Sequence, residues 1–190
     1  RDVAPSRGLG DVYKRQVFLM FDFDSYIRLL REDPKTIVLP EGTDPRVIEA
    51  ASRLLAGNFL QPILIGEEDA VWEAAQEAGY NIRGAKILTP STYEKMDEMV
   101  EQFCEIRAKK GMTQEKAREI LKDPNYFGTM LIKMGEYDSL LGGVMHSVID
   151  TIKPALEIIG TKEGNNLVSS CIGLVRPRAT GDSEVIVLGD

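Results

Sequence analysis

Short apolar segments alternate with amphipathic helical segments along most of this chain, and that alternation restricts the folds that it can adopt. The apolar segments are bounded by glycine, proline or charged residues and span residues 36–40, 61–66, 85–90 and 139–144. Short apolar strands separated by helices are typical of a parallel sheet with helices on both faces. The sequence therefore predicts an α/β fold, with a doubly wound, mostly parallel sheet in a three-layer αβα arrangement.

Helical periodicity and capping residues place helices between these strands. We expect helices over residues 23–31, 67–79, 91–110, 113–121 and 126–134, one more with Thr43 or Asp44 as its N-cap and Pro45 at its first position, and one that begins after His146. Two further strands, at residues 167–175 and 184–188, follow each other without a helix between them. They are predicted to form an antiparallel hairpin or a strand pair that leaves the main sheet.

Three regions are expected along the chain. Residues 1–19 carry four basic residues without helical or strand periodicity and precede Met20, so we interpret them as a non-native or disordered leader, with a transit peptide as the competing interpretation. Residues 20–160 are expected to form a first α/β domain. Residues 161–190 are expected to begin a second α/β domain that is truncated directly after an apolar strand.

Composition excludes several classes of function. With 30 acidic and 23 basic residues among 190, the chain has a net charge of −7, which repels nucleic-acid phosphates. No apolar run approaches the roughly 18 residues that cross a bilayer, so no membrane partner is expected. Cys104 and Cys171 have no metal-ligand spacing and are predicted to be buried, which favours a cytoplasmic location and argues against disulfides and a metal site.

The segment LGGVMHSVIDTIKP has the most specific local pattern of the chain. A predicted strand ends at Gly142 and Gly143, and Ser147 with Asp150 three residues later has the form of a capping box. Glycines allow close backbone approach, and a helix N-terminus presents N–H groups and the positive end of the helix dipole. The segment therefore predicts an anion-binding site, to which Lys153 adds a positive charge.

Single residues near this segment also have ordinary structural explanations. His146 is predicted to be either a general base or hydrogen-bond donor to an acyl or phosphoryl oxygen, or a structural hydrogen-bonding residue. Ser147 lacks a nucleophile-elbow motif, and its capping role accounts for it. Arg107 lies in the basic end of a predicted helix, where cations complement the helix dipole.

Three strand-to-helix turns, at residues 40–46, 66–69 and 142–147, are expected to face one crevice. Ligands of open α/β sheets bind at the carboxyl ends of the strands, so the crevice is the place to look for a site. The alternative is that the glycines of these turns, such as Gly42 and Gly66, serve only turn geometry. The chain contains neither GxGxxG nor GxxxxGK[ST], so a dinucleotide fingerprint and a P-loop are both excluded.

Several motifs occur in the order in which a known enzyme family has them. They are LPEGTDPRV, PILIG, EIRAKKG, YFGTMLIKMGEYDSLLGG and, most specifically, HSVIDTIKPALEIIGTKEG followed by VSSC. With these motifs the chain, from about residue 35 to residue 190, resembles the phosphate acetyltransferase and phosphate butyryltransferase family.

The resemblance implies an acyltransferase that exchanges an acetyl group between coenzyme A (CoA) and phosphate, giving acetyl phosphate and CoA. CoA is then a substrate, no bound cofactor or metal is needed, and the full-length enzyme is expected to be a homodimer of acetate metabolism. Two alternatives stay open. One is a phosphate butyryltransferase, and the other is a non-catalytic acyl-CoA sensing domain like those fused to malic enzymes.

The resemblance also assigns residues to a substrate site. Arg107 in EIRAKKG matches a family arginine associated with CoA binding. Lys153 stands where the family usually has arginine, so it keeps the charge and loses the bidentate fork. The remaining residues match the family's block at the substrate cleft. The expected binding residues are Arg107, Gly142, Gly143, His146, Ser147, Asp150, Thr151 and Lys153.

The family's SRG-type catalytic motif lies in the later half of the family's chain, and nothing in residues 20–190 matches it. The catalytic residues are therefore expected in a C-terminal part beyond Asp190, and their identity stays unknown. On this interpretation the chain is a first domain with the beginning of a second, and it has negligible acyltransferase activity on its own.

Overall fold

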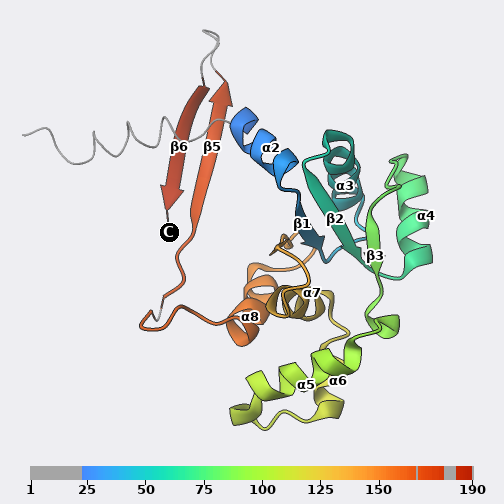
Figure 1. Ribbon diagram of the computed structural model, residues 1–190, viewed down its shortest axis with the longest axis vertical. Coiled ribbons are helices and arrows are strands. Elements are labelled where there is room, and N and C mark those ends of the chain that lie inside the picture. Colours follow the sequence, from blue (N-terminus) through green and yellow to red (C-terminus); the bar gives the residue numbers. More distant parts are fainter. Residues whose placement is uncertain (1–22, 166, 178–182, 190) are drawn as a thin grey trace, which may run out of the picture. The chain divides into compact units, whose positions relative to one another are not determined.

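The computed structural model describes residues 23–165, 167–177 and 183–189, so the leader predicted for residues 1–19 lies outside the described residues. The chain divides into two compact units (Figure 1). The larger unit is Arg28–Gly160, and the smaller one combines Thr161–Asp190 with the chain up to Ile27. Within the described residues, no helix combines the length and the apolar character needed to cross a membrane.

Strands and helices alternate in the larger unit, as the sequence predicts. Helix α2 (Phe23–Glu32) precedes it and extends into it. The elements that follow are β1 (Lys35–Leu39), α3 (Pro45–Gly57), β2 (Leu60–Ile65), α4 (Glu68–Ala78), β3 (Lys86–Leu88), the 3₁₀ turn η1 (Pro90–Thr92), α5 (Met96–Ile106), the 3₁₀ turn η2 (Ala108–Lys110), α6 (Gln114–Ile120), α7 (Pro124–Lys133), β4 (Ser139–Leu140) and α8 (Val148–Ile158).

The four strands form one parallel sheet in the order β3-β2-β1-β4. Helices α3 and α4 connect β1 to β2 and β2 to β3, and the chain then returns to place β4 on the free side of β1. The direction of winding therefore reverses between β1 and β4. This topological switch point is where open α/β sheets bind ligands.

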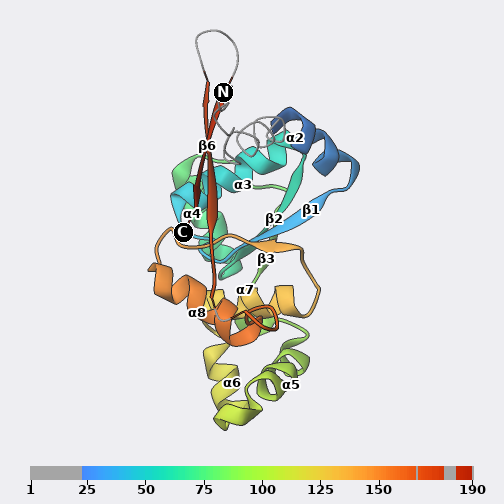
Figure 2. The ribbon, with the colours of Figure 1, turned by 90° about the vertical axis from the view of Figure 1, so that its left-hand side faces the viewer.

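Alternate residues of the strands are buried in two different hydrophobic cores, one on each face of the sheet. This gives the three layers. Ile63 and Ile65 belong to a cluster with residues of α5, α6, α7 and α8. Leu64, between them, packs with residues of α3 and α4 on the other face of the sheet. Figures 1 and 2 show the two groups of helices on either side of the strands. The predicted three-layer, doubly wound sheet is confirmed.

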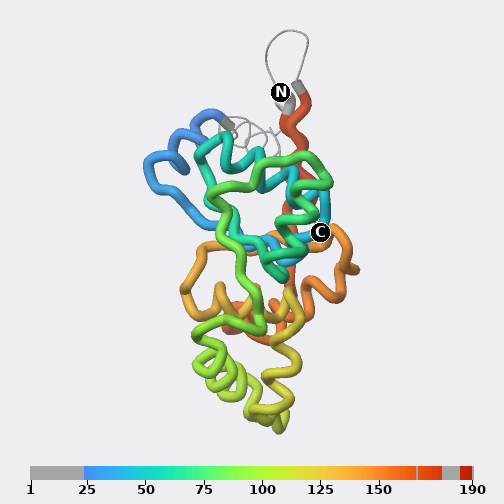
Figure 3. Tube along the Cα trace, turned by 90° about the vertical axis from the view of Figure 1, so that its right-hand side faces the viewer, coloured from blue at the N-terminus to red at the C-terminus, as the bar shows by residue number. Residues whose placement is uncertain are grey.

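The connection from β3 to β4 is long because it carries α5, α6 and α7. Figure 3 shows this connection leaving the sheet after β3 and turning back at α5 and α6, which lie at the end of the unit remote from α3. The single helix predicted over residues 91–110 is wrong, because η1, α5 and η2 are separate elements. The buried face of this segment, formed by Met96, Met99, Val100 and Phe103, extends only over α5.

The strand predicted over residues 139–144 is also shorter than expected. Only Ser139 and Leu140 pair with β1, and the chain beyond them turns toward the loop that follows β1. The other predicted strands and helices of this unit occur with small shifts of their ends.

The smaller unit contains the predicted antiparallel hairpin, made of β5 (Cys171–Pro177) and β6 (Ser183–Gly189) with Leu174 opposite Ile186. The prediction that Cys171 is buried is wrong, because the side chain is exposed on this two-stranded ribbon, whereas Cys104 is partly buried. Apolar residues of the hairpin are exposed as well, namely Ile172, Leu174, Ile186, Val187 and Leu188.

Helix α7 packs closely on the sheet through Gly128. A Cβ atom at this position would lie 2.6 Å from Leu140 Cδ1 and 3.1 Å from Ile65 Cδ1. We expect Gly128→Ala to lower the free energy of unfolding by about 1 to 2 kcal/mol, because overpacking outweighs the gain in helix propensity. Urea denaturation measures this change.

A double-mutant cycle with Leu140→Ala serves as the control for this prediction. Since Leu140→Ala removes the atom that the new Cβ meets first, Gly128→Ala should cost less in that background. A stabilising Gly128→Ala would show that propensity dominates and would contradict the packing described here.

Candidate functional site

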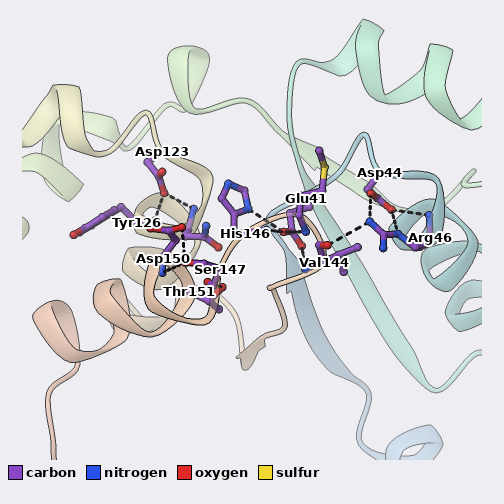
Figure 4. Close-up of polar contacts among 12 residues, drawn as sticks. Glu41, Asp44, Arg46, Asp123, Tyr126, Val144, His146, Ser147, Asp150 and Thr151 are labelled. Atoms are coloured by element: carbon purple, nitrogen blue, oxygen red, sulfur yellow. Dashed lines mark hydrogen bonds and ion pairs between the residues drawn. The ribbon is translucent and has the colours of Figure 1, made fainter.

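The candidate site lies where the loops after β1 and β4 meet at the switch point of the sheet. The loop after β1 contains Glu41 and Gly42, and the loop after β4 spans residues 141–147. The two loops are about one hundred residues apart in sequence and are joined by side-chain hydrogen bonds (Figure 4). Of the three turns predicted to face one crevice, those of residues 40–46 and 142–147 therefore meet, whereas the place of the turn of residues 66–69 in such a crevice stays a prediction.

Glu41 holds the two loops together. Its carboxylate accepts hydrogen bonds from the backbone N–H groups of Val144 at 2.8 Å, Met145 at 2.6 Å and His146 at 3.0 Å. The side chain is only 1% exposed. A buried carboxylate is costly unless it is hydrogen-bonded, and here several donors converge on it.

These donors also determine the charge state of Glu41. Burial alone would raise its pKa, but the N–H groups of Met145, Val144 and His146 and the His146 ring outweigh burial, and the pKa lies below its ordinary value. Glu41 is therefore ionised at neutral pH. The N–H groups of the loop after β4 thus already bind an anion, the carboxylate of Glu41.

The Glu41 carboxylate changes which groups of the loop are available to an external anion. The sequence predicts exposed N–H groups in the glycine loop, but those of residues 144–146 are bonded to Glu41. An external anion at this loop must use other groups. Sequence reasoning missed Glu41, because a glutamate in a turn beside Gly42 cannot be told by pattern from an exposed loop residue.

Glu41 also orients His146. The ring Nδ1 lies 2.8 Å from Glu41 Oε1, and the side chain is 33% exposed. Because the carboxylate is ionised, Nδ1 carries the hydrogen of this bond, and Nε2 is left to accept or donate a hydrogen bond. His146 thus has a structural hydrogen bond, and its second nitrogen is not used by Glu41.

A second tie joins the same loops through Asp44. Asp44 caps α3, as predicted, and its carboxylate pairs with both Nε and Nη2 of Arg46 at 3.0 and 2.8 Å. Arg46 Nη2 also donates to the carbonyl of Val144 at 3.3 Å. The Arg46 guanidinium holds the pKa of Asp44 below its ordinary value, so this pair is ionised at neutral pH.

The start of α8 borders this site and has the predicted capping arrangement. Ser147 Oγ accepts from the Asp150 N–H at 3.2 Å and donates to Asp150 Oδ2 at 2.7 Å, and this bond keeps the pKa of Asp150 low. Thr151 Oγ1 donates to the carbonyl of Ser147 at 3.1 Å. Since both hydroxyls have local partners, they hold the helix start in place.

The two glycines of the loop have different roles. Gly143 has φ +102°, a conformation that side chains disfavour, and a Cβ there would lie 3.5 Å from Thr151 Oγ1. A Cβ at Gly142 would lie 3.0 Å from Pro40 Cγ and 3.2 Å from Asn125 Oδ1. Gly142 is therefore needed for close packing of the loop.

Arg107 and Lys153 lie in a separate place from the Glu41 loops. Both line a cavity of about 420 Å³ between the ends of α5, α6 and α7 and the middle of α8, together with Met112, Glu119, Ile120, Asp123, Tyr126 and Glu157. Arg107 Nη2 pairs with Glu157 Oε1 at 3.2 Å. The predicted site residues thus fall into two groups. Arg107 and Lys153 line this cavity, and the others lie in the switch-point loop and the first turn of α8, namely Gly142, Gly143, His146, Ser147, Asp150 and Thr151.

Among the described residues, no group of three or more histidine, cysteine, aspartate or glutamate side chains is arranged to hold a metal ion. The predicted site residues offer groups for anion binding and hydrogen bonding. Arg107 and Lys153 supply positive charge, and His146 supplies a ring nitrogen.

Comparisons with known proteins agree on one family. The family model described as phosphate acetyl/butaryl transferase matches residues 23–190. The chain is 46% identical over 140 residues to the phosphate acetyltransferase of Bacillus subtilis strain 168, covering 74% of this chain and 43% of the relative. It is 41% identical over 150 residues to the phosphate acetyltransferase of Staphylococcus aureus strain MRSA252, covering 79% and 44%.

Solved structures give the same result. The EutD phosphotransacetylase from Staphylococcus aureus matches with a TM-score of 0.72 and 37% identity over 85% of this chain and 49% of that one. A phosphotransacetylase from Streptococcus pyogenes matches with a TM-score of 0.73 and 38% identity, covering 87% and 51%. The chain thus spans less than half of the length of the curated relatives named here.

The hydrogen bonds that Glu41 accepts predict that its replacement lowers the free energy of unfolding strongly. Glu41→Gln keeps the shape but places an amide NH₂ against backbone donors, so we expect a loss of about 3 kcal/mol in the free energy of unfolding. Glu67→Gln is the matched control, because Glu67 is exposed in the turn after β2 and makes no side-chain cap bond. Urea denaturation at neutral pH should show little change for this control.

The lowered pKa of Glu41 also predicts how the difference depends on pH. Stabilisation by the ionised carboxylate is fully present above its ordinary pKa of 4.5 and is lost as the pH falls through the lower value of the folded state. The stability gap between the wild type and Glu41→Gln should therefore narrow below about pH 4.5. A gap that stays constant down to the acid transition would contradict an ionised Glu41.

Proposed function

Because this chain belongs to the phosphate acetyl/butaryl transferase family, we propose that it forms part of a phosphate acetyltransferase. In the proposed reaction, the CoA thiolate attacks the carbonyl carbon of acetyl phosphate. The new carbon–sulfur bond forms, the carbon–oxygen bond to phosphate breaks, and phosphate leaves. The observation that carries the proposal is the identity of 46% over 140 residues with an enzyme of that name.

We propose that the cavity around Arg107 and Lys153 binds phosphate groups of CoA. Guanidinium and ammonium groups suit phosphate oxygens, and a cavity of about 420 Å³ has room for such a group. Lys153 binds as a point charge, whereas an arginine would add a second parallel hydrogen bond.

The loops at the switch point are proposed to face the reacting end of the substrates. Its available groups are the Nε2 of His146 and the backbone near Gly142 and Gly143, because Glu41 already uses the N–H groups of residues 144–146. Nε2 is placed to accept a proton from, or donate one to, a thiol or phosphoryl oxygen.

We further propose a cytoplasmic enzyme that works as a homodimer and uses no bound cofactor. The relatives are named phosphate acetyltransferase, which favours acetyl over butyryl transfer and favours an enzyme over a sensing domain.

Substitutions in the cavity test where CoA binds. We expect Arg107→Ala to weaken CoA binding by the 190-residue chain about tenfold, since it removes one of the two cations. Lys153→Arg should strengthen binding a few-fold by restoring a bidentate contact. Arg118→Ala is the matched control, because Arg118 pairs with Asp97 outside the cavity. Isothermal titration calorimetry with CoA measures all three.

An activity assay tests whether this chain binds CoA without catalysing acetyl transfer. Since the chain covers less than half of its curated relatives, we expect it to bind CoA and to form acetyl-CoA from acetyl phosphate at a negligible rate. The S. aureus EutD enzyme, assayed in parallel, is the positive control. Comparable turnover by this chain would show that the described residues are sufficient for the chemistry.

A further inference from the structure

Arg107 is only half paired in the cavity. Its Nη2 meets one oxygen of Glu157 at 3.2 Å, while its Nε is buried and has no hydrogen-bond partner. An arginine and a carboxylate frequently align to form two parallel hydrogen bonds. Something therefore prevents Glu157 from offering both of its oxygens to Arg107.

Tyr126 explains the incomplete pair. Its hydroxyl donates to Glu157 Oε2 at 2.8 Å, whereas the oxygen that pairs with Arg107 is Oε1. Burial, together with the contact to Glu157, raises the pKa of Tyr126, so the hydroxyl keeps its proton and remains a donor. The carboxylate of Glu157 is thus divided between Tyr126 and Arg107.

We propose that Glu157 and Tyr126 together set the affinity of the Arg107 cavity for a phosphate group. Glu157 competes with the phosphate for Arg107, and Tyr126 limits that competition to one oxygen. A phosphate that enters then replaces a weak end-on pair rather than a bidentate one. This inference rests on the proposed binding of CoA at Arg107.

The other two carboxylates of the cavity lining have partners other than Arg107. Glu119 pairs with Lys122 at 2.5 Å, and the carboxylate of Asp123 caps α7 by accepting from the N–H groups of Asn125 and Tyr126. Lys153 is the second cation of the lining. Glu157 is therefore the carboxylate of this lining that contacts Arg107.

The proposal predicts opposite effects for two conservative variants. Glu157→Gln removes the competing charge and should tighten CoA binding about fivefold. Tyr126→Phe frees the second oxygen of Glu157 for Arg107 and should weaken binding about threefold. In Tyr126→Phe/Glu157→Gln the weakening should disappear. Calorimetric titration of the 190-residue chain with CoA measures these changes.

Glu119→Gln is the matched control for charge. It removes a carboxylate from the same lining without touching Arg107, so its effect should be much smaller than that of Glu157→Gln. Equal effects of Glu119→Gln and Glu157→Gln on CoA affinity would overturn the proposal, because they would show that the total charge of the lining determines the affinity. Weakening by both Tyr126→Phe and Glu157→Gln would overturn it in favour of a purely structural network.

NMR of the Arg107 Nε–H, without any ligand, separates this inference from the proposed function. If Tyr126→Phe lets Glu157 align with Arg107, this proton should gain an acceptor and shift downfield, and an unchanged proton would overturn the inference. If CoA binding is absent, or does not respond to Arg107→Ala, the proposed CoA site at Arg107 fails, whatever the NMR result.

Discussion

The buried carboxylate of Glu41 is the interaction on which the candidate site depends. Parallel strands β1 and β4 are neighbours, but their pairing is short, and only two residues of β4 take part. Beyond β4, the chain is held by Glu41 through the N–H groups of three consecutive residues. Without that carboxylate, these three N–H groups would lose their acceptor, and the loop that carries His146 would lose its fixed position.

Helix α8 connects the two parts of the proposed site. Ser147 starts the helix beside the switch-point loops, and Lys153 and Glu157 lie further along it at the cavity with Arg107. A rise of 1.5 Å per residue places Lys153 about 9 Å along the helix from Ser147. This arrangement suits a long substrate with phosphates at one end and a reacting group at the other. The fixed start of α8 at Glu41 therefore also affects how the cavity is placed.

The sequence predicts the architecture well because the fold is specified locally. Alternation within Ile63–Ile65, capping by Asp44 and Ser147 and the lone hairpin are all encoded by neighbouring residues. The polar network is not local. Glu41 and His146 are 105 residues apart, and a glutamate in a turn has the pattern of any exposed loop residue. The Arg107–Glu157–Tyr126 contacts likewise depend on the packing of α7 against α8, which residue spacing does not reveal.

An NMR titration of the Glu41 side-chain carboxyl carbon, followed together with the amide protons of Val144, Met145 and His146, tests the central claim most directly. The structure predicts that the carboxyl titrates below its ordinary pKa of 4.5 and that the three amide protons shift with it in the same transition. A carboxyl that titrates at or above 4.5, or amide protons that do not follow it, would contradict the account of a charged Glu41 holding the loop.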